Sequence, residues 1–284
     1  VRAEGKQLTK ITNIVEQQQI KPVLHPKRFS INEINEALTL VATGRPEGKV
    51  IGKELADRFA TGGSNLVLVA RSGETLERLA TDYRKNYGIE VTVIVKDVAS
   101  PSVPLAIKQE LDARQIHIDY LVNNAGFGLY GPFLETDLDQ ELNMIDVNIR
   151  ALTEMTKRFL PAMVERGTGG ILNVSSMVGF FPGPLMSVYY ASKSFVLSFT
   201  EAIENEVSGS GVTVTALCPG VTATGFVDRA GMGKSKLFRQ GNVMNAGRVA
   251  DEAYAGFLRG ERLIIPGRQN RVLANVPRFL PRRM

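Results

Sequence analysis

From Leu66 onward, the chain alternates between short apolar segments and longer segments with helical periodicity. Residues 74–88 and 137–167 are the clearest of the helical segments. Uninterrupted apolar strands between helices are typical of a parallel sheet that helices cover on both faces. The sequence therefore predicts an α/β fold with a doubly wound parallel sheet. The strands we expect are residues 66–70, 91–95, 118–123, 170–175, 212–218 and 262–266.

Composition limits the class of protein further. The chain has 284 residues, of which 44% are hydrophobic and 22% are charged. This suits one large domain, or one domain with an appendage, and argues against a disordered chain. Cys218 is the only cysteine, so no disulfide can form within the chain and we expect a reducing, cytoplasmic location. One cysteine and two scattered histidines, His25 and His117, argue against a zinc site, and we expect no bound metal.

The formal net charge is +5, and arginines near the C-terminus supply much of the excess. A solvated tail is one interpretation, and adhesion to an anionic membrane surface or a nucleic acid is the alternative. We expect no nucleic-acid partner. The sequence has no run of about 20 apolar residues, and its first residues lack the apolar core of a signal peptide. The arginines are Arg268, Arg271, Arg278, Arg282 and Arg283.

Tyr189 and Lys193, in the stretch "SSMVGFFPGPLMSVYYASK", are four residues apart on a predicted helix and share one of its faces. A tyrosine titrates near pH 10, and a nearby ammonium, helped by a bound cationic nicotinamide, lowers that pKa. The phenol can then exchange a proton with a carbonyl or an alcohol. Ser176 lies at the end of a predicted strand, where its hydroxyl can hold the substrate oxygen. A Tyr–Lys pair on a helix surface is the structural alternative.

Other polar motifs stand near the ends of predicted elements. "LVNNAG", ending at Gly126, lets the backbone approach a ligand or forms an Asn-rich turn. Asn148 lies in an apolar helical run, as a functional amide or as a satisfied core amide. Asp97 can accept a hydrogen bond from an adenine amino group or cap a helix. Thr222 and Thr224 follow "CPG" and can bind a carboxamide or a phosphate, or stand in a turn.

The order and spacing of these motifs resemble the short-chain dehydrogenase/reductase family, from about Ile51 to the C-terminus. The resemblance implies a Rossmann-like domain that binds NAD(P)H and reduces a carbonyl or oxidises an alcohol. It implies Tyr189 as general acid/base and Lys193 as a ligand of the nicotinamide ribose that also lowers the Tyr189 pKa. Ser176 would polarise the carbonyl, and Asn148 would hold a proton-relay water. The implied cofactor residues are Gly44, Gly48, Gly52, Arg71, Asp97, Val98, Asn124, Ala125, Gly126, Tyr189, Lys193, Pro219, Gly220, Thr222 and Thr224.

Arg71 follows segment 66–70, at the position where NAD-specific enzymes carry an acidic residue for the ribose 2′-OH. A guanidinium suits a 2′-phosphate, so we predict NADP(H), with a solvated loop arginine as the alternative. Segments 126–133 and 177–186 are apolar and aromatic. If they line the pocket, as the resemblance suggests, the substrate is a fairly hydrophobic carbonyl or alcohol. We expect residues 227–245 to form a substrate lid.

The first strand of the family's sheet and its T-G-x3-G-x-G phosphate loop have no regular counterpart here. Thr43-Gly44, Gly48 and Gly52 form T-G-x3-G-x3-G, which is two residues too long. The following helix is regular, because Ile51, Leu55 and Phe59 recur every four residues. We therefore expect a first strand that is irregular or replaced.

Residues 1–51 differ from the rest of the chain. A capping box of Ser30 and Glu33 favours a helix that Gly44 would end. The stretch "KPVLHPKRFSINEINEALTLVATGRPEGKVI" resembles the C-terminal end of the medium-chain dehydrogenase/quinone-reductase family, a part that brings no catalytic residues. Either this end abuts a short-chain domain that lacks its first strand, or "LTLVATG" fills the strand position. We expect an appendage over residues 1–48 and a catalytic domain over 49–284.

These patterns lead us to expect an NADP-dependent oxidoreductase that acts on a hydrophobic small-molecule carbonyl or alcohol. The irregular glycine loop motivates an alternative, a non-catalytic scaffold or a fused or internally deleted product with impaired cofactor binding. The resemblance also implies a homodimer or homotetramer, formed through the long helices around residues 137–165 and 188–207.

Overall fold

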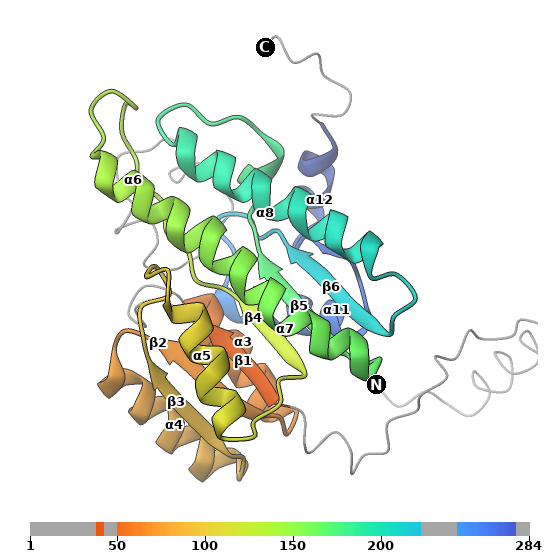
Figure 1. The fold of residues 1–284 in the computed structure, drawn as a ribbon. Coiled ribbons are helices and arrows are strands. Elements are labelled where there is room, and N and C mark those ends of the chain that lie inside the picture. The colour runs from red at the N-terminus through yellow and green to blue at the C-terminus, as the bar shows by residue number, and fades with distance from the viewer. Residues whose placement is uncertain (1–37, 43–49, 223–242, 277–284) are drawn as a thin grey trace, which may run out of the picture. The chain divides into compact units, whose positions relative to one another are not determined.

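Parallel strands form one seven-stranded sheet in the part of the protein that the structure describes. This computed structural model describes residues 38–42, 50–222 and 243–276, all within one unit, Asn35–Met284. The strand order is β3-β2-β1-β4-β5-β6-β7 (Figure 1). The strands are β1 (Leu38–Ala42), β2 (Asn65–Ala70), β3 (Val91–Val95), β4 (Tyr120–Asn123), β5 (Gly169–Val174), β6 (Val212–Leu217) and β7 (Leu263–Ile264).

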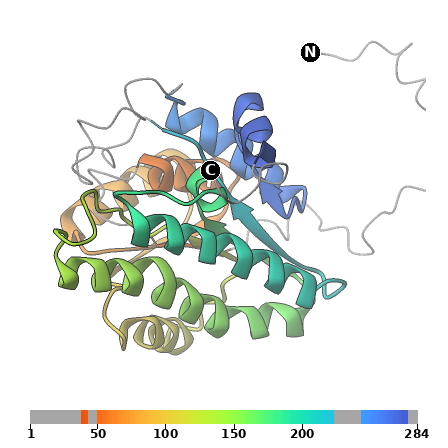
Figure 2. The same ribbon diagram turned by 90° about the horizontal axis from the view of Figure 1, so that it is seen from above.

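Helices cover both faces of the sheet, as the alternation of apolar segments predicts (Figure 2). Successive side chains of a strand point to opposite faces. In β2, Leu66 and Leu68 pack with α3, α4 and α11, whereas Val67 and Val69 pack with α5 and α7. The helices are α3 (Val50–Thr61), α4 (Gly73–Tyr87), α5 (Val103–Ala113), α6 (Leu138–Ile145), η2 (Asp146–Ala151), α7 (Leu152–Arg166), η3 (Met177–Phe180), α8 (Ser187–Glu206), α11 (Ala246–Leu258) and α12 (Arg268–Asn275).

Strand β1 occupies the middle of the sheet, between β2 and β4. Leu40 is in register with Val67 on one side and with Leu121 on the other. The helix that Ser30 and Gly44 were expected to bound is therefore wrong for residues 38–42, and the hypothesis that "LTLVATG" fills the strand position is confirmed there. The capping box acts only locally, whereas an empty position would leave backbone groups of two neighbouring strands unpaired. Ser30, Glu33 and Gly44 lie outside the described residues.

The six strands expected from Leu66 onward are all present, with ends that differ by a few residues from the prediction. The sheet takes its middle strand from residues 1–48, the range we expected to form an appendage. The helix predicted over 137–167 begins and ends near those bounds, but its middle, Asp146–Ala151, is π-helical. Apolar periodicity does not reveal such a turn, and π-helical turns are frequent at functional sites.

The strand order reverses at β1, because β2 and β3 lie on one side of it and β4 to β7 on the other. In doubly wound folds, ligands bind outside the carboxyl ends of the strands at such a switch point. Ala42 at the end of β1 is in register with Asn123 at the end of β4. The predicted site residues that follow β2, β4, β5 and β6 therefore lie at one edge of the sheet.

Candidate active site

The predicted catalytic pair lies on the buried side of α8, where Tyr189 and Lys193 are only 7% and 5% exposed. The Lys193 ammonium is 5.9 Å from the centre of the Tyr189 ring. It donates a hydrogen bond of 2.8 Å to the carbonyl oxygen of Val174, the last residue of β5. The predicted Tyr–Lys pair is therefore a buried pair and not a pair on the helix surface.

Ser176 follows β5 and begins the short helix η3. Its Oγ accepts from the Val178 N–H at 3.3 Å and lies 3.5 Å from the Pro219 carbonyl oxygen. Both distances are long for hydrogen bonds of these types. A hydrogen bond with Tyr189 joins Ser176 to the predicted catalytic pair. The structure therefore brings Ser176, Tyr189 and Lys193 together, as predicted.

Burial dominates the electrostatics of this cluster. It raises the pKa of Tyr189 well above the ordinary value, and the hydrogen bond with Ser176 lowers that pKa by less. It also lowers the pKa of Lys193 to about 8. We expected Lys193 to lower the Tyr189 pKa. In the structure the influence that lowers it is the hydrogen bond with Ser176, while the Lys193 ammonium donates to the Val174 carbonyl.

Asn148 lies in the π-helical turn η2 and is 1% exposed. Its Nδ2 donates to the Phe127 carbonyl at 3.0 Å and to Ser192 Oγ at 2.9 Å, and its Oδ1 accepts from the Phe127 N–H at 3.0 Å. A Cβ at Gly126 would lie 2.8 Å from Asn148 Oδ1 and 3.3 Å from Lys193 Nζ. The Asn148 amide is thus satisfied by protein groups, and it fixes the loop after β4 beside Lys193.

Ser192 is a member of this cluster that sequence reasoning missed. Its hydroxyl accepts from Asn148 and donates to the Tyr189 carbonyl at 2.7 Å. It therefore joins the π-helical turn to the helix that carries the catalytic pair. A small polar residue between Tyr189 and Lys193 in "YYASK" was the available signal, but serines are common in helices and the pattern alone did not single it out.

Among the predicted cofactor residues, Arg71 follows β2 and forms an ion pair with Asp97, with Arg71 Nη1 and Asp97 Oδ2 3.2 Å apart. Both side chains are close to half exposed. Asp97 Oδ1 also accepts from the Ala99 N–H at 3.0 Å. The structure thus joins the residue predicted for the 2′-phosphate to the residue predicted for the adenine. Of the other predicted cofactor residues, Val98 and Ala125 are half-buried, while Asn124 and Gly126 are buried.

The predicted glycine loop is described only in part. β1 ends at Ala42 and α3 begins at Val50, so Gly44 and Gly48 lie in the connection, outside the described residues. Gly52 is buried in the first turn of α3. Thr224 and most of the predicted lid, residues 227–242, also lie outside the described residues.

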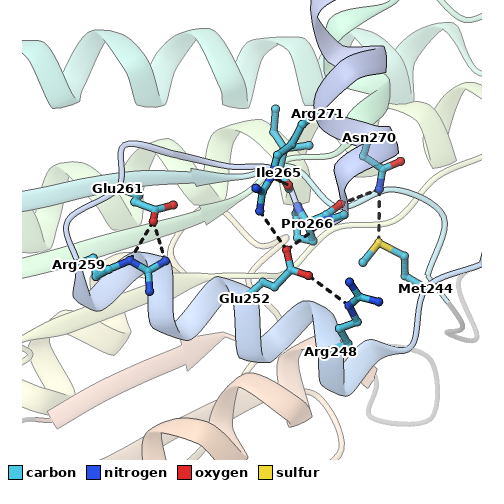
Figure 3. Close-up of polar contacts among 10 residues, drawn as sticks. Met244, Arg248, Glu252, Arg259, Glu261, Ile265, Pro266, Asn270 and Arg271 are labelled. Carbon is cyan, nitrogen blue, oxygen red and sulfur yellow. Dashed lines mark hydrogen bonds and ion pairs between the residues drawn. The ribbon is translucent and has the colours of Figure 1, made fainter. Parts of the chain in front are cut away.

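The segments on either side of residues 223–242 are joined to each other. Thr222 and Met244 form a parallel bridge, and the Met244 N–H donates to the Val221 carbonyl at 2.8 Å. Asn270 Nδ2 donates to the Pro266 carbonyl at 2.7 Å and lies 3.4 Å from Met244 Sδ (Figure 3). A Cβ at Gly220 would lie 2.6 Å from Asn270. Asn270, which the sequence did not single out, therefore packs against both Gly220 and Met244.

Two of the C-terminal arginines, Arg268 and Arg271, belong to helix α12 and not to an irregular tail. Arg271 donates to the Ile265 carbonyl at 2.9 Å and pairs with Glu252 at 3.3 Å (Figure 3). A pocket of about 620 Å³ beside β7 is lined by residues of this corner, including Glu252, Arg259 and Arg271, and by none of the predicted site residues.

The described residues offer neither a metal site nor a membrane span. Within 38–42, 50–222 and 243–276, no group of three or more His, Cys, Asp or Glu side chains could hold a metal ion. No helix in that same part of the protein has both the length and the apolar character needed to cross a membrane.

Together, a doubly wound parallel sheet and a Ser–Tyr–Lys cluster at its carboxyl edge, with Tyr189 and Lys193 buried and Ser176 half-buried, define the Rossmann-like class of fold. The chain belongs to the short-chain dehydrogenase family, whose profile, described as "short chain dehydrogenase", matches residues 39–234. The match begins at β1, about a dozen residues before the start at Ile51 that we predicted. It therefore includes the strand that the sequence left in doubt.

Similar proteins support this assignment. The very-long-chain 3-oxoacyl-CoA reductase of Homo sapiens is 38% identical over 188 residues, which is 65% of this chain and 59% of that protein. Hydroxysteroid dehydrogenase-like protein 1 of Gallus gallus is 37% identical over 190 residues, 66% of this chain and 56% of that protein. The matched region thus spans less than two thirds of the length of these relatives.

Among solved structures, a short-chain dehydrogenase from Sphingobium yanoikuyae in complex with NADPH superposes with a TM-score of 0.76. It is 31% identical, and the superposition covers 87% of this chain and 97% of that one. The family match gives no support to the predicted likeness of residues 1–51 to medium-chain dehydrogenases.

Proposed function

We propose that this protein transfers a hydride between NADP(H) and a fairly hydrophobic carbonyl or alcohol, with Tyr189 as the general acid/base. The observation that carries the proposal is the cluster of half-buried Ser176 with buried Tyr189 and Lys193 at the carboxyl edge of the sheet. Membership of the short-chain dehydrogenase family supports it. The donors near that edge also fit the cofactor, since Arg71 offers a half-exposed guanidinium for a phosphate.

The protein's own residues have distinct tasks in carbonyl reduction. NADPH, when bound, would supply the hydride that the carbonyl carbon accepts. Ser176 Oγ, whose contacts with Val178 and Pro219 are long, donates a hydrogen bond to the substrate oxygen. The Tyr189 hydroxyl gives its proton to that oxygen as the C=O double bond becomes a single bond. Lys193, anchored on Val174, keeps a positive charge near the phenolate that forms. In alcohol oxidation the same proton returns to Tyr189.

A titration of NADPH fluorescence tests the cofactor part of the proposal. Saturable binding well below millimolar NADPH is expected. Absence of binding up to millimolar concentration would favour the alternative, a non-catalytic scaffold or a fused or deleted product, which the irregular glycine loop motivates.

The role of Tyr189 has its own test. Tyr189→Phe should abolish turnover and leave NADPH affinity nearly unchanged, because only the hydroxyl is removed. Tyr190→Phe is the matched control, since Tyr190 is the adjacent, half-buried tyrosine, and it should keep most of the activity. Retained turnover in Tyr189→Phe would refute the assignment of the proton donor.

The preference for NADP(H) over NAD(H) rests on Arg71 at the end of β2. A guanidinium matches a phosphate better than a ribose hydroxyl, and the solved relative from Sphingobium yanoikuyae was found with NADPH. We expect the dissociation constant for NADPH to be lower than that for NADH. Equal affinities for the two would remove the basis for this preference.

The substrate proposal rests on the apolar surroundings of Tyr189. Met144, Met186 and Tyr189 form a buried cluster, against which Phe127, Leu129, Tyr130, Val178, Val188 and Tyr190 pack. The relatives described as very-long-chain 3-oxoacyl-CoA reductases suggest fatty 3-oxoacyl thioesters as one candidate class. The specificity constant kcat/KM should rise with acyl length in a 3-oxoacyl-CoA series. If kcat/KM does not change with acyl length, and the protein acts on aromatic or steroidal ketones, the hydroxysteroid type of substrate would be favoured instead.

We also propose a homodimer or homotetramer through α6, α7 and α8. Leu138, Leu142 and Ile145 recur along one side of α6, and they are 65%, 49% and 36% exposed. Such an exposed apolar stripe suits a contact with a second copy. Leu142→Lys should shift the mass in analytical ultracentrifugation towards the monomer. A monomeric wild-type protein would contradict this.

Three further expectations remain proposals. A cytoplasmic location is consistent with the single, buried Cys218 and is tested by fractionation of cells that express the full-length protein. Binding to neither nucleic acid nor anionic vesicles is expected at physiological salt. For residues 1–48, the likeness to the C-terminal end of medium-chain dehydrogenases predicts that removing residues 1–30 leaves the catalytic domain folded and active.

A further inference from the structure

Three consecutive residues of the segment that ends β5 each make a hydrogen bond to helix α8. Asn173 Nδ2 donates to Thr200 Oγ1 at 3.1 Å. The Val174 carbonyl accepts from Lys193 Nζ at 2.8 Å, and Ser175 Oγ donates to the Lys193 carbonyl at 2.7 Å. The next residue is Ser176, which bonds Tyr189. Residues 173–175 thus contact α8 at two places, Lys193 in the predicted catalytic pair and Thr200 farther along the helix.

The second contact point is part of a buried series of polar side chains that crosses the sheet. Asn173 Oδ1 accepts from Asn123 Nδ2 at 2.8 Å, and the same nitrogen lies 3.2 Å from Thr156 Oγ1. Thr156 belongs to α7, Asn123 to β4, Asn173 to β5 and Thr200 to α8. None of the four is more than 4% exposed. Buried amides and hydroxyls cost free energy unless they are paired, so each of these bonds holds its partner in place.

The spacing of the contacts on α8 restricts how that helix can move. Lys193 and Thr200 are seven residues apart, so they lie on the same face about 10 Å apart along the axis. One attachment point would let α8 rotate or tilt about it. Two points on one face, both attached to β5, oppose rotation and sliding together.

Rotation or sliding of α8 would move Tyr189 relative to Ser176, which follows β5 and is not part of the helix. The distance between the proton donor and the group that holds the substrate oxygen therefore depends on how α8 is docked on β5. In a well-oriented reaction, a misplacement of about 1 Å can cost on the order of 10²-fold in rate.

We propose that Asn173 and Thr200 are positioning residues, which fix the position of α8 on β5 and so keep Tyr189 within hydrogen-bonding distance of Ser176. This proposal rests on the function proposed above for Tyr189. The alternative is that the Asn173–Thr200 bond only contributes stability, as any satisfied buried pair does.

Kinetics of Thr200→Val, with Thr215→Val as matched control, separate these two roles. Both changes remove a buried hydroxyl at nearly constant volume. Thr215 is 0% exposed in β6, and its hydroxyl donates to the Glu261 carbonyl before β7 at 2.8 Å and so does not attach α8. We expect Thr200→Val to lower kcat about tenfold, as for a Tyr189 misplacement of less than about 1 Å, with KM values changed less than twofold. Thr215→Val should keep kcat, and Thr200→Ser, which restores a hydroxyl, should recover it. Equal kcat in the two valine variants would overturn the proposal.

A second measurement does not depend on turnover. The protein has seven tyrosines, and incorporated 3-fluorotyrosine gives each a ¹⁹F NMR signal. The Tyr189 signal is identified by its loss in Tyr189→Phe. It should shift in Thr200→Val and keep its position in Thr215→Val. If the wild-type protein shows no turnover, the proposed function is refuted, but the Tyr189 signal still tests the positioning role of Thr200. If turnover is normal and the Tyr189 signal does not shift in Thr200→Val, only the positioning role is refuted.

Discussion

A proline at position 40 tests the placement of β1, on which the completeness of the domain depends. Leu40 lies at the centre of β1, in register with Val67 of β2 and Leu121 of β4. Proline removes the backbone N–H at this position, and its ring projects towards a neighbouring strand. Since β1 has a strand on each side, the lost donor would face a paired backbone and not solvent.

The expected loss of stability follows from these pairings. The acceptor left without its partner costs about 1–3 kcal/mol. The displacement of the neighbouring strand by the ring adds to this, so we expect a total loss of about 3 kcal/mol, at the upper end of that range. For a domain of this size, 1 kcal/mol corresponds to roughly 2–4 °C in Tm. Leu40→Pro should therefore lower Tm by about 6–12 °C.

Thermal unfolding gives the size of the effect, and hydrogen exchange locates it. Amides of β2 (Asn65–Ala70) and β4 (Tyr120–Asn123) should lose protection in Leu40→Pro, because their pairing with β1 is disturbed. The control Leu40→Val keeps the N–H and should leave exchange unchanged. Unaltered protection of both strands in Leu40→Pro would refute a β1 in the middle of the sheet, even if Tm fell, since a proline within a separate helix would also be destabilising.

Three further outcomes are expected. Arg71→Gln should weaken NADPH binding about tenfold and leave NADH binding unchanged; this is the lower end of the range for a hydrogen bond to a charged group, because Arg71 is half exposed. Arg114→Gln, which changes an exposed and paired arginine just after α5, should alter neither the NADPH nor the NADH affinity in the same titrations. Gly126→Ala places a Cβ 2.8 Å from Asn148 Oδ1, so it should lower the free energy of unfolding, measured with denaturant, by about 1–3 kcal/mol and should also lower kcat. An unchanged kcat would mean that the loop after β4 accommodates the added methyl group without moving the site. Lys193 has a pKa of about 8 in the folded protein against 10.5 ordinarily, so the unfolded state binds more protons between these values. The full cost in folding stability of burying the Lys193 ammonium is therefore present below pH 8. The free energy of unfolding of the wild type minus that of Lys193→Met should rise by about 3 kcal/mol from pH 8 to 10.5. A difference that stays constant across that range would contradict the low pKa.

Most of the sheet and the catalytic pair were predictable because their signals are local. An apolar strand such as β5 or β6 is legible from five or six residues, and Tyr189 and Lys193 are close in sequence. By contrast, Asn173, Thr200 and Asn123 meet from three different elements. No spacing in the sequence reveals such a contact, because it exists only once the strands and α8 have packed.

Sequence alone therefore determined the doubly wound class and the family, and it predicted the grouping of Ser176, Tyr189 and Lys193 that the structure brings together. Tertiary structure decided two questions that local patterns left open. It made residues 38–42 a strand, because two neighbouring strands require backbone partners and a capping box several residues earlier does not supply them. It also made burial, more than the nearby lysine, the dominant influence on the Tyr189 pKa, because the sheet and α8 exclude water from both side chains.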